Sequence, residues 1–438
     1  MRCPLAAVGL GLTLGCGGPL GAPDAGAWGG DAGRPDVGPC VPLELPADAL
    51  AATRLSCAFE AGASPIQTLG LDRATVARIP IDHVVVVMQE NRSFDHLFAT
   101  LHDTRPEVEA IPAAYVNPDR AGVPVRPFHL TSGCLPADPP HQWDAMHAQW
   151  NGGAMDGFVR TAAVGGLDGH YATGFHDASD TPFYHWLART FPLADRHFAS
   201  VLAGTWANRA VLYTGSTHGL RNTGEFTIAD APTVFDALDA RGVSWGVYVD
   251  GTPRQDLLGW TAAHRGVAPF SALLDALSSG SLPSVSFVDP TDMQDEHPPN
   301  DVRGGEAWSR RVYEASTSSP LWPRLAVVFT YDEGGGLFDH VPPPSACMPS
   351  PGLEGTDVLG HRVPLLVVSP WARPGHVSHV VHDHASVLRF IQLLFDLPAL
   401  SARDANADAL LDMFEFSCPP PFAEAPRSPA AGDAQVCP

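Results

Sequence analysis

The sequence IDHVVVVMQENRSFDH (residues 81–96) joins an apolar run directly to a polar one. Residues 84–88 of the apolar part are four valines and a methionine. A β-branched run without alternating polar positions is typical of a strand buried on both faces of a parallel sheet. Ligands of open α/β sheets bind at the carboxyl ends of the strands. The polar residues from Gln89 onward are therefore where we expect a functional site.

The same kind of apolar run recurs along the chain and alternates with helical patterns. Further strands are expected at 243–249, 284–288, 325–331 and 363–369. Helices are expected at 207–214, 233–240, 270–277, 307–315 and 386–395. This alternation predicts a three-layer α/β/α sandwich with a mostly parallel central sheet. Residues 101–174 lack the pattern, and we expect loops and short helices there.

The composition narrows the class of protein. The chain has 438 residues, of which 45% are hydrophobic and 17% charged, enough for a large buried core. Its formal net charge of -22 argues against a nucleic-acid-binding protein and against electrostatic attraction to anionic lipid. An anionic substrate would therefore need a local cation. A metal ion held by carboxylates would provide one.

The N-terminus predicts export. Residues 1–16 contain one arginine, a short apolar stretch and small residues, as a signal peptide does. Thr13-Leu14-Gly15-Cys16 resembles a bacterial lipoprotein processing site, which would make Cys16 the lipid-bearing residue. The alternative is an ordinary secretory signal in which Cys16 has no role. We expect the protein in the bacterial cell envelope or outside the cell, with a lipid anchor as its only attachment to the membrane.

The remaining chain divides into three parts by composition. Residues 17–77 are expected to be a flexible tether and an N-terminal extension, residues 78–419 the catalytic domain, and residues 420–438 a tail held by Cys437. Without Cys3 and Cys16, six cysteines remain, and an even number in an exported protein suggests three disulfides with 15 possible pairings. These cysteines are Cys40, Cys57, Cys134, Cys347, Cys418 and Cys437. The chain has no CxxC spacing, so a zinc-thiolate site is not expected.

Acids, amides and histidines follow three of the predicted strands. Glu90 and Asn91 follow the first, Asp289 and later Asp295-Glu296-His297 follow the third, and Asp332-Glu333 follows the fourth. Oxygen and imidazole groups are the ligands that divalent metals such as Mg²⁺, Ca²⁺ and Zn²⁺ use in proteins. Three glycines after Glu333 would permit a close approach of the backbone. The alternative is that these acids cap helices or face water, which three clusters together make less plausible than one.

Four blocks of the sequence also resemble one protein family. They are ENRSFDH (residues 90–96), NGGAMDGF (151–158), LAGTWANR (202–209) and YDEGGGLFDHVPP (331–343). In this order they resemble the bacterial phosphoesterase family of phospholipases C and acid phosphatases, over roughly residues 81–397. The resemblance implies a fold similar to that of the alkaline phosphatase superfamily.

The resemblance implies a nucleophile and a metal site. Thr205 matches the residue that attacks phosphorus, giving a phosphothreonine that water hydrolyses. Ala207 stands where the family often has proline. The implied metal ligands are Glu90, Asn91, Thr205, Asp332 and Glu333. The metal would be divalent, with Ca²⁺, Mg²⁺, Zn²⁺ and Mn²⁺ all left open, and would activate the hydroxyl group. The alternative for Thr205 is a helix N-cap without a chemical role.

Histidines and amides complete the candidate site. His141 and His297 match family histidines that would bind phosphate oxygens and protonate the leaving group. His340 is a further catalytic candidate, and His147, Asn151 and Asn208 are substrate-binding candidates. With nineteen histidines in the chain, most must have other roles. Two polar residues are interpreted as structural: Ser93 as the cap of the helix that begins there, and Asp383 as the cap of the last helix.

Three functions remain open. The first is phospholipase C-type cleavage of a phospholipid phosphodiester, favoured by threonine at position 205. The second is an acid phosphatase acting on small phosphomonoesters, since the C-terminal β domains of the longer phospholipases are not expected in this chain. The third is an inactive envelope lipoprotein with a binding role, which would be expected to have lost the metal-binding residues. Assays of a phosphodiester beside a phosphomonoester, and metal analysis, would distinguish them.

Overall fold

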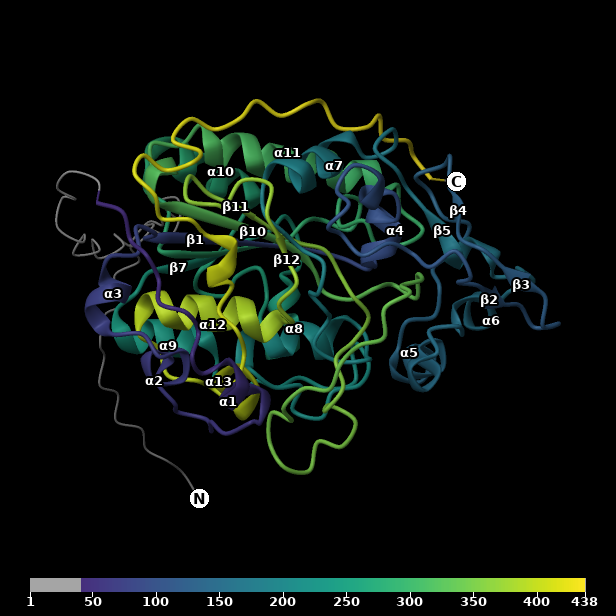
Figure 1. Cartoon of the computed structure of the whole chain (residues 1–438), viewed down its shortest axis with the longest axis horizontal. Coiled ribbons are helices and arrows are strands. Elements are labelled where there is room, and N and C mark those ends of the chain that lie inside the picture. The colour runs from purple at the N-terminus through teal and green to yellow at the C-terminus, as the bar shows by residue number, and fades with distance from the viewer. Residues whose placement is uncertain (1–40, 438) are drawn as a thin grey trace, which may run out of the picture.

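The computed structural model describes residues 41–437 and is built around one eight-stranded sheet (Figure 1). In spatial order the strands are β12 (Val377–Ser378), β6 (Leu193–Ala194), β11 (Leu365–Val368), β10 (Leu325–Tyr331), β1 (His83–Gln89), β9 (Val285–Val288), β7 (Trp245–Tyr248) and β8 (Val267–Ala268). The central strands β1 and β10 pair in parallel, from His83 opposite Leu325 to Gln89 opposite Tyr331. Their carboxyl ends therefore lie side by side.

Helices cover both faces of the sheet, which confirms the predicted three-layer arrangement (Figure 1). One face packs against α7 (Pro182–Thr190), α10 (Phe270–Ser279) and α11 (Val302–Thr317), and the other against α8 (Thr205–Thr214), α9 (Val234–Arg241) and α12 (His384–Phe395). Alternate residues of β1 enter the two cores: Val84 and Val86 pack toward α12, and Val85 and Val87 toward α11. Because both faces are covered, the central valines are all buried, as the sequence predicts.

The sheet is mostly parallel, and within the described residues β11 is its exception. β11 runs antiparallel to both of its neighbours, β10 and β6, whereas the other neighbouring strands are parallel. The cause is the connection, since residues 332–364 form a long loop without a helix. A parallel neighbour requires a crossover connection, but a loop can return the chain directly as an antiparallel strand.

The expected elements are found, with shifted ends. The strand at 325–331 has the predicted bounds, while helix α8 begins at Thr205, two residues before the expected start. Helix α11 begins at Val302 and not at 307, because the Asp301 side chain accepts the backbone N–H of Arg303 and caps the helix there. Ser93 and Asp383 are the N-cap residues of α4 (Phe94–Phe98) and α12, which confirms both structural interpretations.

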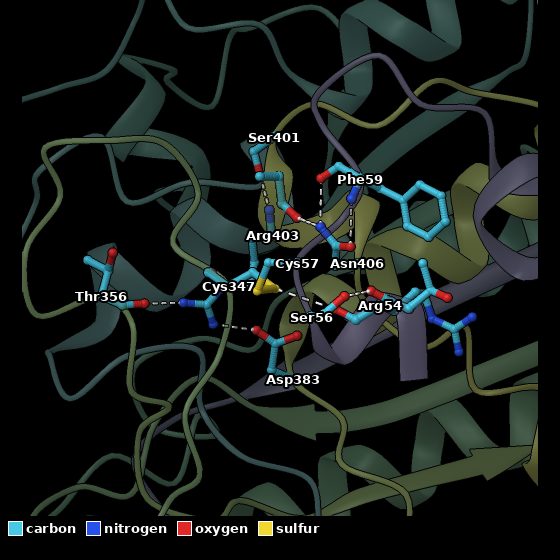
Figure 2. Close-up of a disulfide and its surroundings, with 12 residues drawn as sticks. Arg54, Ser56, Cys57, Phe59, Cys347, Thr356, Asp383, Ser401, Arg403 and Asn406 are labelled. Carbon is cyan, nitrogen blue, oxygen red and sulfur yellow. Dashed lines mark hydrogen bonds and ion pairs between the residues drawn. A yellow bond between two sulfur atoms is a disulfide. The ribbon is translucent and has the colours of Figure 1, made fainter. Parts of the chain in front are cut away.

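Residues 41–77, interpreted as an extension, pack against the body of the protein. They form α1 (Ala51–Leu55), α2 (Pro65–Leu69) and α3 (Arg73–Ala77), and Leu69 and Val76 are buried in the core that contains α12. A disulfide joins Cys57 to Cys347 in the loop after β10. Figure 2 shows Arg403, from the short helix α13 (Ala402–Ala405), beside this disulfide. Its Nε donates to the carbonyl of Cys347 over 2.6 Å, and its Nη1 lies 3.2 Å from Asp383.

The irregular segment predicted at 101–174 lies beside one end of the sheet (Figure 1). It contains α5 (Trp143–Trp150), α6 (Phe158–Ala162) and the two-residue strands β2 (Asn117–Pro118), β3 (Pro124–Val125), β4 (Phe128–His129) and β5 (Gly174–Phe175). The C-terminal segment runs over α10 and α11 toward β4 and β5 (Figure 1). A disulfide between Cys134 and Cys437 fixes its end, which confirms that Cys437 holds the tail.

Several predicted features lie outside the described residues. The signal peptide, the lipidation site Cys16, and Cys40 precede residue 41. Cys418, within the described residues, is disulfide-bonded, as are the cysteines of the two disulfides given above. Between residues 41 and 437, we find no helix with the length and apolar character needed to span a membrane.

Candidate active site

A pocket of about 590 Å³ opens where the carboxyl ends of β1 and β9 meet the start of helix α8. Its wall includes three of the predicted catalytic residues, Thr205, His141 and His297, and the predicted metal ligand Glu90. The remaining lining residues are Asp138, Pro139, Pro140, Gln142, Trp206, Thr223, Arg254, Asp256, Asp292, Asp295 and Asn300. Five carboxylates thus face this one cavity.

Asn91 and Asp332 join the ends of β1 and β10 next to the pocket. The backbone N–H of Asn91 donates to Oδ1 of Asp332 over 3.2 Å, and both side chains are buried. Asn91 has a φ of 62°, a left-handed conformation that few residues other than glycine adopt. Gly335 packs against this turn, and a Cβ atom there would lie 2.2 Å from the Asn91 carbonyl oxygen. The glycine run after Glu333 therefore allows the close backbone approach that the sequence predicts.

Two buried oxygens in this region have no hydrogen-bond partner, namely Oδ1 of Asn91 and Oε1 of Glu333. Both side chains adjoin Nε2 of His141, which lies 3.3 Å from Nδ2 of Asn91 and 3.7 Å from Oε1 of Glu333. Unpaired buried acceptors are rare because leaving them without a partner costs about 1–3 kcal/mol each. Both oxygens belong to the predicted ligand set, and oxygen donors suit a hard divalent ion. The residues present therefore fit a metal ion.

The buried side chain of Arg209 contacts three carboxylates that follow different strands. This fully buried guanidinium lies 3.1 Å from Oε1 of Glu90, 2.7 Å from Oδ1 of Asp289 and 3.4 Å from Oδ2 of Asp332. Burial alone would lower the pKa of Arg209, but these carboxylates raise it well above its usual value. One permanent positive charge thus keeps three strand-end acids close to one another.

Thr205 is the first residue of helix α8, and the N-cap residue is Gly204. The alternative in which Thr205 serves as the helix cap is therefore not what the structure contains. The amide of Asn208 fixes the preceding turn: Nδ2 donates to the carbonyl of Ala203 over 2.7 Å, and Oδ1 accepts the N–H of Val201 over 3.0 Å. Asn208 is a predicted substrate-binding residue, but it is buried and its polar atoms hold the loop that leads to Thr205.

His141 and His297 lie together in the pocket wall. Their ring centroids are 5.4 Å apart, at an edge-to-face angle. Nδ1 of His141 donates to the carbonyl of Pro139 over 2.7 Å, which turns Nε2 toward Glu333. Burial disfavours the charged ring, but the carboxylates of Glu333 and Asp138 outweigh this effect and raise the pKa of His141 to about 10.

Three further predicted residues, His340, His147 and Asn151, lie outside the pocket wall, as do Asn91, Asp332, Glu333 and Asn208. Nδ1 of His340 pairs with Oδ2 of Asp95 over 2.6 Å in a buried cluster that also holds Arg362. His147 on α5 has its Nδ1 2.8 Å from the carbonyl of Trp143. Asn151 is exposed and donates to Asp156 over 2.8 Å. The geometry gives each of these three side chains a structural partner, and their predicted roles at the site find no support in it.

The structure adds two arginines that the sequence analysis did not select. Arg254, in a short 3₁₀ helix (Arg254–Leu258), lines the pocket with Nε 2.8 Å from Oε1 of Glu90, and Arg209 lies behind it. The sequence does contain one indication of their importance. The chain has no lysine, so its 26 lysine-or-arginine positions are all arginines. An arginine within an acid-rich, strand-end region is then the only kind of side chain available to carry a fixed positive charge.

Comparisons with known proteins identify a family that this chain resembles along most of its length. A model of the Phosphoesterase family matches residues 81–398. Phospholipase C B of Mycobacterium tuberculosis is 33% identical over 78% of this chain and 78% of that protein. Non-specific phospholipase C1 of Arabidopsis thaliana is 32% identical over 77% of this chain and 71% of its own length. Non-hemolytic phospholipase C of Pseudomonas aeruginosa is 32% identical over 80% of this chain and 60% of its own length.

Solved structures with some similarity have low sequence identity. One is described as a protein in the alkaline phosphatase superfamily from Vibrio parahaemolyticus, with a TM-score of 0.39, 12% identity, and coverage of 75% of this chain and 69% of that one. Another is the phosphonate monoester hydrolase of Agrobacterium radiobacter, with a TM-score of 0.37, 11% identity, and coverage of 72% and 74%.

Proposed function

The chain belongs to the Phosphoesterase family and is a phosphoric ester hydrolase, and we propose that it cleaves phospholipid phosphodiesters in the manner of a phospholipase C. The pocket that Thr205 shares with Glu90, His141 and His297 carries this proposal. The names of the relatives support the phospholipase reaction over simple phosphate release.

Thr205 is the proposed nucleophile. Its hydroxyl oxygen attacks phosphorus, the bond from phosphorus to the glycerol oxygen breaks, and diacylglycerol leaves while the phosphorylated head group stays on the threonine. Water then hydrolyses this phosphothreonine and releases the head-group phosphate. The position of Thr205 at the first turn of α8 supports this role, because backbone N–H groups there can donate to phosphate oxygens.

A divalent metal ion would be held by Glu90, Asn91, Thr205, Asp332 and Glu333. When bound, it would neutralise the negative charge of the phosphate and lower the pKa of the attacking hydroxyl. The buried oxygens of Asn91 and Glu333 that have no hydrogen-bond partner support this assignment. Oxygen donors of this kind suit Ca²⁺, Mg²⁺, Mn²⁺ and Zn²⁺, and metal analysis of the purified protein distinguishes these ions.

The histidines and arginines of the pocket complete the proposed machinery. His141 and His297 bind phosphate oxygens and give a proton to the leaving oxygen. Arg254 lies half-buried at the pocket wall, and its guanidinium can attract the phosphate into an otherwise acidic cavity. Arg209 is a positioning residue, since its contacts are with carboxylates and a backbone carbonyl.

We also propose that the protein acts outside the cytoplasm. The disulfides Cys57–Cys347 and Cys134–Cys437 support an oxidising compartment. Attachment through a lipid on Cys16 is the proposed link to the membrane. A Cys16→Ser variant expressed in the native type of host should then lose incorporation of labelled fatty acid and appear in the soluble fraction.

The decisive test compares two substrates on the same purified protein. A soluble choline phosphodiester and an aryl phosphomonoester are assayed in parallel, with and without added divalent ions. Faster turnover of the diester supports the phospholipase C proposal. Faster turnover of the monoester would instead identify an acid phosphatase, the second function that the sequence leaves open.

A further inference from the structure

A second group of metal-ligating side chains lies away from the pocket, where β4 and β5 meet helix α7. It consists of His129 on β4 and of His176, Asp177 and Asp180 in the segment between β5 and α7. Nε2 of His129 lies 2.7 Å from Oδ2 of Asp180 and 3.6 Å from Oδ2 of Asp177. Nδ1 of His176 lies 3.7 Å from the same oxygen of Asp180.

His176 is the member of this group that points to a ligand. Its side chain is completely buried, and neither ring nitrogen has a hydrogen-bond partner. A buried imidazole loses its hydrogen bonds to water, and the contact with Asp180 over 3.7 Å is too long to replace one. Its Nδ1 is directed toward Asp180, so a group placed between them would satisfy it.

The neighbouring hydrogen bonds orient the carboxylates. Oδ1 of Asp177 accepts the N–H of Ser179 over 2.7 Å and its hydroxyl over 2.6 Å, which leaves Oδ2 facing His129. The backbone N–H of Asp177 donates to Oδ2 of Asp180 over 3.0 Å. Such outer contacts fix the direction of ligating groups in metal sites.

From this arrangement we propose that His129, His176, Asp177 and Asp180 bind a zinc ion in a structural site. Zinc takes four nitrogen and oxygen ligands at about 2.0–2.2 Å in a tetrahedron, so the ligand atoms lie roughly 3.3 Å apart. The separations from His129 to Asp180, from His129 to Asp177 and from His176 to Asp180 lie on either side of this value. The ligand atoms of His129, Asp177 and Asp180 lie within 4.8 Å of one another, and the ring of His176 would move toward them to complete the tetrahedron. Two imidazoles and two carboxylates are a ligand set of the borderline type that zinc prefers.

The ion would join strand β4 to the segment that leads into helix α7. β4 and β5 pair over two residues only. The C-terminal segment passes close by, and a Cβ atom on Gly432 would lie 2.3 Å from the carbonyl oxygen of Asp180. The site would thus fix β4 to the start of α7 beneath the tail, close to where Figure 1 marks the C-terminus.

The test counts zinc in the full chain. The protein is incubated with Zn²⁺, passed through gel filtration and analysed by mass spectrometry, both as wild type and as Asp332→Asn, which removes a proposed ligand of the catalytic ion. His129→Ala is introduced into both backgrounds. His170→Ala is the matched control, because His170 is a partly exposed histidine beside Asp168 and Asp119 but outside this group.

We expect His129→Ala to lower the count by one zinc ion per chain in both backgrounds, and His170→Ala to leave it unchanged. The tetrahedral absorption of Co²⁺-loaded Asp332→Asn should likewise disappear with His129→Ala. An unchanged count in both backgrounds would overturn the proposal and identify His129 and Asp180 as a simple ion pair. Asp177→Ala provides the same comparison if His129→Ala does not fold.

Discussion

The guanidinium of Arg209 lies 2.7 Å from the carboxylate of Asp289, and both side chains are buried. Glu90 and Asp332 contact the same arginine. These three acids follow three different strands, β9, β1 and β10. These three acids at the end of the sheet therefore share one cation that the protein itself supplies.

Removing this cation should destabilise the fold. In Arg209→Met the three carboxylates keep their burial but lose their common partner, and breaking a buried ion pair in this way costs about 3–5 kcal/mol. Urea unfolding followed by circular dichroism gives the free energy. Arg241→Met is the control, because Arg241 is half exposed and makes one surface ion pair with Asp396. Equal stabilities of the two variants would show that Arg209 does not hold the three acids together.

Thr205→Ala should abolish hydrolysis and leave the fold intact. The side chain is small and lies at the pocket surface, so its loss should cost little stability. Loss of a nucleophile lowers kcat by roughly 10³-fold or more. Thr205→Ser keeps the hydroxyl group and should retain substantial activity. Turnover by the alanine variant at a rate close to that of wild type would exclude Thr205 as the nucleophile.

Asp332→Asn should lower the content of bound divalent metal and the rate together. Asp289→Asn is the matched control, since Asp289 contacts Arg209 but is not a proposed ligand. Metal analysis after gel filtration and activity with added ions are measured on both. Chelation of wild type should reduce turnover, and added divalent ion should restore it. Full metal occupancy in Asp332→Asn would exclude that residue as a ligand.

Acid should destabilise the protein through its buried neutral histidines. Burial lowers the pKa of His185 to about 4, while its ordinary value is about 6.5. Between these values the unfolded chain binds a proton that the folded chain does not, so stability falls as pH drops from 6.5 to 4. The shift corresponds to on the order of 3 kcal/mol.

In His185→Gln this pH dependence should become shallower by about that amount. Glutamine cannot titrate, and its amide can replace the ring nitrogen that lies 3.0 Å from the carbonyl of Leu97. Unfolding free energies at several pH values measure the slope. An unchanged slope in His185→Gln would disprove the assignment.

Loss of the Cys57–Cys347 disulfide should loosen residues 41–77. Replacing both cysteines by serine should cost about 2–5 kcal/mol, since the bond closes a long loop. Limited proteolysis should then cleave this segment first. The double serine variant of Cys134 and Cys437 is the control, because that bond joins other segments of the chain. Equal protection of residues 41–77 in both variants would argue against this role of the bond.

The central part of the fold is predictable because burial on both faces leaves a clear pattern. The valine run of β1 and the run of β10 indicate their strands directly. Strands β6 and β12 have two residues each and give no such pattern. Strand β11 is antiparallel because the connection before it contains no helix. The residue pattern of a strand does not indicate its direction in the sheet.

The candidate site is predictable where residues follow strands. Glu90, Asn91, Asp332 and Glu333 come together because β1 and β10 pair in register. The role of Asn208 is not predictable in this way, since an amide side chain near the start of a helix can bind a substrate or donate to the backbone of the preceding loop. His340 stands in a recognisable motif, but its partner Asp95 is 245 positions away along the chain, and sequence spacing does not reveal that pairing.

The two ends of the loop between β10 and β11 lie close together, because β11 pairs antiparallel with β10. Its far end, around Pro351 and Gly352, is exposed, and a Cβ on Gly352 would meet no other atom within 4 Å. A foreign peptide grafted at that tip would change neither strand register nor the spacing of Asp332 and Glu333 from Asn91. The tip is thus an attachment point for an epitope or a fluorescent label.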